Sequence, residues 1–140
     1  MADILHTVQM NASPADVFAA LTERAGASAG WARASSTAPR LHSLSDFRFG
    51  DGKVVVRMRI AALEKGAKLA WQCVAGPPDW VGTSVTFDLA REGDDTVVRF
   101  AHRGWKEATD LMGRCSATWA HFLFGLKSML ETKEPDDLYV

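Results

Sequence analysis

The sequence predicts an α+β fold in which a curved antiparallel sheet wraps around one long helix near the C-terminus. From Asp110 to Glu131 the apolar residues recur mostly at steps of three and four and so form one helical stripe, made of Met112, Cys115, Trp119, Phe122, Leu123, Leu126 and Leu130. Residues 54–102 instead show short segments of alternating character separated by turn residues. Because a helix with such a stripe is stable in water only under an apolar cover, we expect the strands to curl around it.

Length and charge fit one domain over residues 1–140. The formal net charge is −1, from 16 basic and 17 acidic side chains, so no global field favours nucleic acid or an anionic membrane as a partner. No apolar run approaches the length of a membrane span. The two cysteines, Cys73 and Cys115, are too few for a disulfide framework, and the N-terminus does not resemble a signal peptide. We expect two buried reduced thiols and a cytoplasmic location.

The N-terminal part predicts a strand followed by a helix. Alternation over residues 4–10 indicates a half-buried strand whose inward face carries Ile4, His6, Val8 and Met10. Ser13 supplies an N-cap hydroxyl and Pro14 suits the first helical position, so the helix is predicted to begin there and to end near Gly26. Residues 25–32, small apart from Trp31, suit a short helical turn that could act as a gate, and residues 33–40 suit a surface loop.

The middle of the chain predicts a meander of antiparallel strands. Residues 41–49 form an ambiguous strand, and clearer alternation follows over 54–60, 69–73, 85–89 and 98–102, with turn residues between these segments. In the closing helix, Gly113 and Gly125 lower the helix propensity. We interpret both as points where a strand or a ligand comes close to the helix.

Four passages resemble one known family. They are Ser13-Pro14-Ala15-Asp16-Val17-Phe18 with Leu21, Trp80-Val81-Gly82-Thr83-Ser84-Val85-Thr86-Phe87, Phe100-Ala101-His102-Arg103-Gly104-Trp105, and Trp119 followed by Phe122-Leu123-Phe124-Gly125-Leu126-Lys127. These passages are similar to the family named for the activator of the heat-shock chaperone's ATPase, within the START-like (SRPBCC) superfamily. The resemblance implies the helix-grip fold, with two short helices after the first strand. This sequence differs from many members of the family in having Trp31 alone after the first helix, where a tryptophan pair is common.

The resemblance implies several functions, because the superfamily includes lipid carriers, metabolite binders, polyketide aromatases and cyclases, and co-chaperone domains. Our first hypothesis is a domain that holds a hydrophobic or lipid-like ligand between the sheet and the C-terminal helix. The second is a chaperone-associated or other protein-interaction module, acting in the stress response through the outer face of the sheet. The third is a polyketide cyclase or aromatase-like enzyme in which His102 moves protons.

The aromatic residues suggest where a ligand would bind. Trp71, Trp80, Trp105 and Trp119 are spread over strands, a loop edge and the closing helix, so the grip arrangement could bring them to one volume. We expect a pocket wall made of Trp71, Trp80, His102, Trp105, Trp119, Phe122 and Leu123, with Trp31 at its mouth. Packing of the same rings into a core is the alternative.

His102 has two interpretations. Strand alternation places it on the same face as Val98 and Phe100, either as a hydrogen-bonded core histidine or as a catalytic or ligand-orienting group. The other histidines are far from it in the sequence and show no metal-ligand spacing, and no serine lies in a G-x-S-x-G context. The sequence therefore predicts no metal, no cofactor and no catalytic residue.

Overall fold

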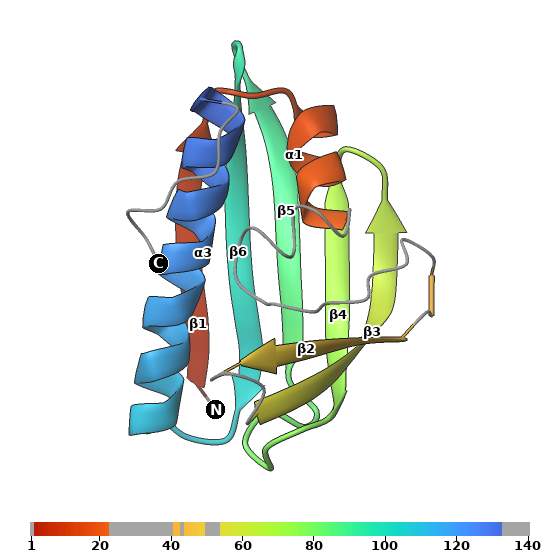
Figure 1. Ribbon diagram of the computed structural model, residues 1–140, viewed down its shortest axis with the longest axis vertical. Coiled ribbons are helices and arrows are strands. Elements are labelled where there is room, and N and C mark those ends of the chain that lie inside the picture. Colours follow the sequence, from red (N-terminus) through yellow and green to blue (C-terminus); the bar gives the residue numbers. More distant parts are fainter. Residues whose placement is uncertain (1, 23–40, 43, 50–53, 133–140) are drawn as a thin grey trace.

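The computed structural model describes residues 2–22, 41–42, 44–49 and 54–132. Six strands form one antiparallel sheet in the order β1-β6-β5-β4-β3-β2 (Figure 1). In chain order the elements are β1 (Ala2–Met10), α1 (Pro14–Thr22), β2 (Leu44–Phe49), β3 (Val54–Glu64), β4 (Lys68–Ala75), β5 (Ser84–Glu92), β6 (Asp95–Trp105) and α3 (Asp110–Thr132). The predicted α+β helix-grip fold, with a strand meander and a long closing helix, is confirmed.

Both helices begin at hydroxyl caps that the sequence carries. Ser13 Oγ accepts a hydrogen bond from the backbone N–H of Asp16 at 3.1 Å, and Pro14 is the first residue of α1. Thr109 Oγ1 accepts in the same way from the N–H of Met112 at 3.3 Å at the start of α3. The predicted end of the first helix near Gly26, the second short helix and Trp31 lie outside the described residues.

The sheet has one face that carries the core. An inward row runs across five strands through Ile4, His102, Val85, Trp71 and Ile60, each paired with the next in register and all buried. Helix α3 packs against β1, whereas helix α1 packs against β5 and β6, so both helices cover this face (Figure 1). The residues that alternate with the inward row face the other side of the sheet.

A β-bulge changes the face of the last residue of β6. Strict alternation from His102 would put Trp105 on the outer face. However, Ile4 pairs with His102 and Ala2 with Trp105, so β6 has one more residue than β1 between these two pairs. The extra residue is accommodated at Gly104, whose φ is 96°. Trp105 therefore turns inward, and its ring centroid lies 4.8 Å from that of His102.

The glycines of α3 do not mark a close strand. A Cβ added at Gly113 or at Gly125 would meet nothing within 4 Å. The interpretation of these residues as points of close approach by a strand is therefore wrong for the part of the chain that the structure describes. Neither α1 nor α3 is long and apolar enough to cross a membrane.

Two glycine-to-alanine substitutions should act in opposite directions. Gly104→Ala should lower the free energy of unfolding by about 1–2 kcal/mol, because an L side chain is strained at a positive φ. Gly125→Ala should raise it by about 0.5–1 kcal/mol, because alanine favours the helix and the site is open. Urea unfolding of both variants measures the difference. Equal effects of the same sign would contradict the assignment of the bulge.

Candidate functional site

Tryptophans from three different segments meet on the inward face of the sheet. Trp80 comes from the β4–β5 connection, Trp105 from the end of β6 and Trp119 from α3. The ring centroid of Trp80 lies 6.0 Å from that of Trp105 and 6.5 Å from that of Trp119. His102 lies between them, with its centroid 4.6 Å from that of Trp80. We call Trp80, His102, Trp105 and Trp119 the aromatic cluster.

The conformation of the β4–β5 connection places Trp80 against His102. The backbone N–H of Trp80 donates to the carbonyl of Pro77 at 2.9 Å, which closes a turn. Residues after the turn return to β4, where Cys73 N donates to Thr83 O at 2.9 Å and Gly82 N donates to Cys73 O at 3.1 Å. The connection therefore has a fixed conformation, and Trp80 and Thr83 both face His102.

The hydrogen bonds of His102 determine its tautomer. An indole nitrogen only donates, so Trp119 Nε1 donates to His102 Nδ1 at 3.1 Å and Nδ1 carries no proton. The neutral ring then has its proton on Nε2, which lies 2.8 Å from Thr83 Oγ1 and donates to it. The Thr83 hydroxyl donates in turn to the carbonyl of Trp80 at 2.6 Å. This chain of three hydrogen bonds joins α3, β6 and the β4–β5 connection.

Burial keeps His102 neutral. The side chain is 0% exposed, and desolvation lowers its pKa from 6.5 to about 4. Protonation would also place an N–H on Nδ1, directly opposite the N–H of Trp119. Both ring nitrogens are engaged with protein groups, so neither is available to accept a proton from a substrate. The geometry favours the interpretation of His102 as a hydrogen-bonded core histidine.

Further polar contacts fasten α3 to β1 and to the residue that follows it. They are His6 Nε2 with Ser116 O at 3.2 Å, Lys127 Nζ with Gln9 O at 3.0 Å, and Asn11 N with Glu131 Oε2 at 2.8 Å. These contacts are spread along the helix from its first half to its last turn. The helix is therefore held in register against the sheet, and Trp119 keeps its position over His102.

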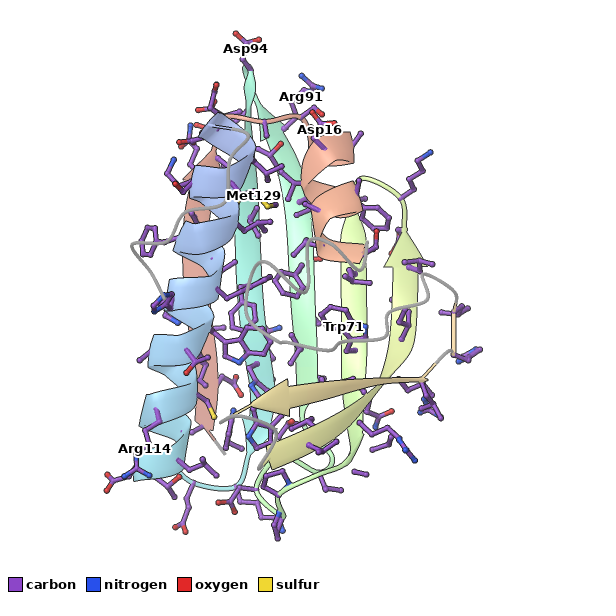
Figure 2. The ribbon with its side chains drawn as sticks, viewed as in Figure 1. Asp16, Trp71, Arg91, Asp94, Arg114 and Met129 are labelled. Carbon is purple, nitrogen blue, oxygen red and sulfur yellow. The ribbon has the colours of Figure 1, made fainter. Side chains whose placement is uncertain are left out.

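The structure brings most of the predicted wall residues together. Phe122 joins the aromatic cluster through Trp119, with ring centroids 5.9 Å apart, and Leu123 is buried in the same core. Trp71 lies farther along the inward row and contacts the cluster through Phe87, 5.8 Å from Trp71 and 6.4 Å from Trp119. Figure 2 shows Trp71 among the side chains in the middle of the sheet, whereas Arg114 projects outward from α3.

Sequence reasoning missed Thr83 and did not single out Phe87. Alternation along β5 could have indicated Phe87, because it lies two residues after the inward Val85. Thr83 had no such signal, since it belongs to a connection whose shape depends on its turn. Both cysteines were expected to be buried. Cys73 is buried, and burial raises the pKa of its thiol to about 11, whereas Cys115 is only half-buried.

One donor in the aromatic cluster has no partner among the described residues. Trp105 is 1% exposed, and its Nε1 makes no hydrogen bond within this part of the chain. A buried donor left unpaired typically costs about 1–3 kcal/mol, so native proteins contain few of them.

The described residues contain no group of three or more histidine, cysteine or acidic side chains that could hold a metal ion.

Comparison with known proteins identifies the family. The sequence profile described as Activator of Hsp90 ATPase homolog 1-like protein matches residues 11–131. The chain belongs to this family. Its fold is similar to that of the Aha1 dimer from Colwellia psychrerythraea, with 36% identity, 94% of this chain and 97% of that chain covered, and a TM-score of 0.84. The family that the sequence passages indicated is therefore confirmed.

Two more distant structures share the fold. Protein MLL2253 from Mesorhizobium loti is 18% identical with a TM-score of 0.84, over 95% of this chain and 99% of that one. DynU16, a protein of the dynemicin biosynthetic locus, is 19% identical with a TM-score of 0.78, over 95% of this chain and 48% of that one. No curated protein sequence matches the chain. At these identities the two structures show a common helix-grip fold.

The stability of the protein should depend on pH through His102. The unfolded chain takes up a proton near pH 6.5, whereas folded His102 resists protonation down to about pH 4. The free energy of unfolding should therefore fall as the pH drops through this window, by up to about 3 kcal/mol from this residue alone.

Urea unfolding over a pH series, for the wild type and for His102→Gln, measures this contribution. The variant lacks the titrating group, so the stability advantage of the wild type should be largest above pH 6.5 and should shrink towards pH 4. A difference between the two proteins that stays constant over this range would contradict the account.

Proposed function

We propose that the chain is a single domain that binds a small hydrophobic or lipid-like molecule between the inward face of the sheet and α3. The observation that carries the proposal is the aromatic cluster, in which indole rings from a connection, a strand and a helix meet around one histidine. Such rings provide large apolar surfaces for flat lipophilic molecules. Membership of the family is consistent with ligand binding or with protein interaction.

The adjacent half of the sheet supports this location. The inward side chains of β3 and β4 include Met58, Ile60 and Trp71, which are apolar and continue the surface that begins at the aromatic cluster. The described helices pack on the same face of the sheet, but over β1, β5 and β6. A ligand lying along β3 and β4 would contact Trp71 and the cluster together. Entry past residues 25–32, with Trp31 at the mouth, belongs to the same proposal.

The polar groups favour an uncharged ligand. His102 is neutral and Thr83 already bonds within the protein. No Lys, Arg, Asp or Glu side chain is buried among the described core residues. Since an unpaired charge is strongly disfavoured in an apolar interior, a neutral lipophile fits this environment better than an anion.

The close packing of the rings predicts slow association. The described members of the proposed wall are between 0% and 5% exposed, so a ligand enters only when side chains move apart. Binding that requires such a change has a lower association rate than binding to an open surface. Core packing of the same rings remains the alternative to be tested.

A protein-interaction module is the second candidate function. The family is described as Activator of Hsp90 ATPase homolog 1-like protein, and the relative from Colwellia psychrerythraea, 36% identical, is described as an Aha1 dimer. The outer face of the sheet, with exposed Arg57 and Arg59 on β3, would be the contact surface for a chaperone or another protein. Arg57→Glu should then abolish capture of the partner and leave lipophile binding unchanged.

An enzymatic function has less support. The third hypothesis required His102 to move protons, but Trp119 and Thr83 occupy both of its ring nitrogens. The likeness to DynU16 at 19% identity concerns the fold alone. A cytoplasmic location is part of the main proposal, supported by the two cysteines, which form no disulfide.

Ligand binding should appear as saturable quenching of tryptophan emission when neutral lipophiles are titrated into the protein. Ile60→Phe adds bulk inside the proposed site and should weaken binding severalfold, because it fills space along β3. Val55→Phe introduces the same residue on the outer side of the same strand, where the position is 38% exposed, and should leave binding unchanged.

Both variants should first be compared with the wild type by circular dichroism, since extra volume in a core is often destabilising. The absence of saturable quenching across a broad panel, or equal weakening in both variants, would overturn the proposed site. Native mass spectrometry of freshly purified protein provides a separate check for a ligand that co-purifies.

A further inference from the structure

Trp105 is the member of the aromatic cluster whose polar atom remains unused. Its Nε1 is buried and makes no hydrogen bond with any residue that the structure describes. The polar atoms of the neighbouring residues bond to one another: Trp119 Nε1 to His102 Nδ1, His102 Nε2 to Thr83 Oγ1, and the Thr83 hydroxyl to the Trp80 carbonyl. None of these atoms bonds to Trp105 Nε1.

The position of this donor depends on the bulge in β6. Trp105 faces inward because of the bulge at Gly104, where φ is 96°. Without the bulge, alternation would place the indole on the outer face, where water could bond to its N–H. A buried donor without a partner among the described residues opposes folding, and the fold retains it.

We infer that the Trp105 indole N–H donates a hydrogen bond to an acceptor oxygen of the bound molecule. This inference rests on the proposed function and narrows its ligand class to neutral lipophiles that carry a carbonyl, ether or hydroxyl oxygen. An apolar molecule without an acceptor would leave the donor unpaired in the complex. A ligand oxygen would give this donor the partner that the described residues do not provide.

A matched pair of probes tests the inference. Acetylnaphthalene and isopropenylnaphthalene have nearly the same shape, but only the first has an oxygen acceptor. The wild type should bind the ketone about three- to tenfold more tightly than the hydrocarbon, as expected for one hydrogen bond. In Trp105→Phe the ring surface is largely kept and the donor is lost, so this preference should disappear.

The outcomes separate the inference from the proposed function. Binding of both probes with equal affinity in the wild type would overturn the inference and leave the proposed function intact. Equal affinity is also the result expected if a buried water or a ring face pairs with the indole N–H of Trp105. Failure of both probes to bind would overturn both. A ketone preference that persists in Trp105→Phe would assign the donor elsewhere and would overturn the inference.

Indole N–H signals in NMR spectra of the wild type give an independent test, which does not require the variant to fold. The Trp105 signal should shift downfield on addition of the ketone and should shift much less with the hydrocarbon. The Trp119 indole is the internal control, because its N–H already bonds to His102 and should respond alike to both probes. Equal shifts of the Trp105 signal with both probes would contradict the inference.

Discussion

The packing of this domain depends on the buried imidazole of His102. Its two ring nitrogens connect α3, through Trp119, with the β4–β5 connection, through Thr83, and the ring itself belongs to β6. The indole N–H can only donate and the carbonyl oxygen can only accept, so the direction of the hydrogen bonds is fixed from Trp119 to the Trp80 carbonyl. A buried network that is fully paired specifies one arrangement of the elements that contribute to it. This arrangement holds Trp80 and Trp119 beside the imidazole ring.

Further polar contacts hold α3 in register against the sheet. His6, Lys127 and Glu131 join α3 to the first strand and the residue after it, at places spread along the helix. The Lys127 and Glu131 contacts are exposed to water and individually weak, whereas the His102 bonds are buried and hard to replace. Helix α3 is therefore held by the buried hydrogen bond to His102 and by more exposed contacts along its length.

Local patterns in the sequence determine much of this fold, and tertiary geometry determines the rest. The 3.6-residue stripe predicted the closing helix to within one residue of its observed end at Thr132, and alternation placed His102 inward. Alternation could not reveal the bulge at Gly104, because an extra residue in one strand is defined only by its pairing with another strand. The partnership of Thr83 with His102 was likewise invisible, since it depends on how a turn returns the chain to β4. Periodicity therefore predicts which residues face the candidate site, but it does not predict the hydrogen bonds between them.

The tautomer of His102 is the most direct measure of this account. Long-range proton–nitrogen correlation NMR of the imidazole ring distinguishes a protonated nitrogen from a bare one. At neutral pH the geometry predicts a proton fixed on Nε2 and a bare Nδ1 that accepts from the Trp119 indole. A proton on Nδ1, or rapid averaging between the two nitrogens, would contradict the network and the packing that depends on it.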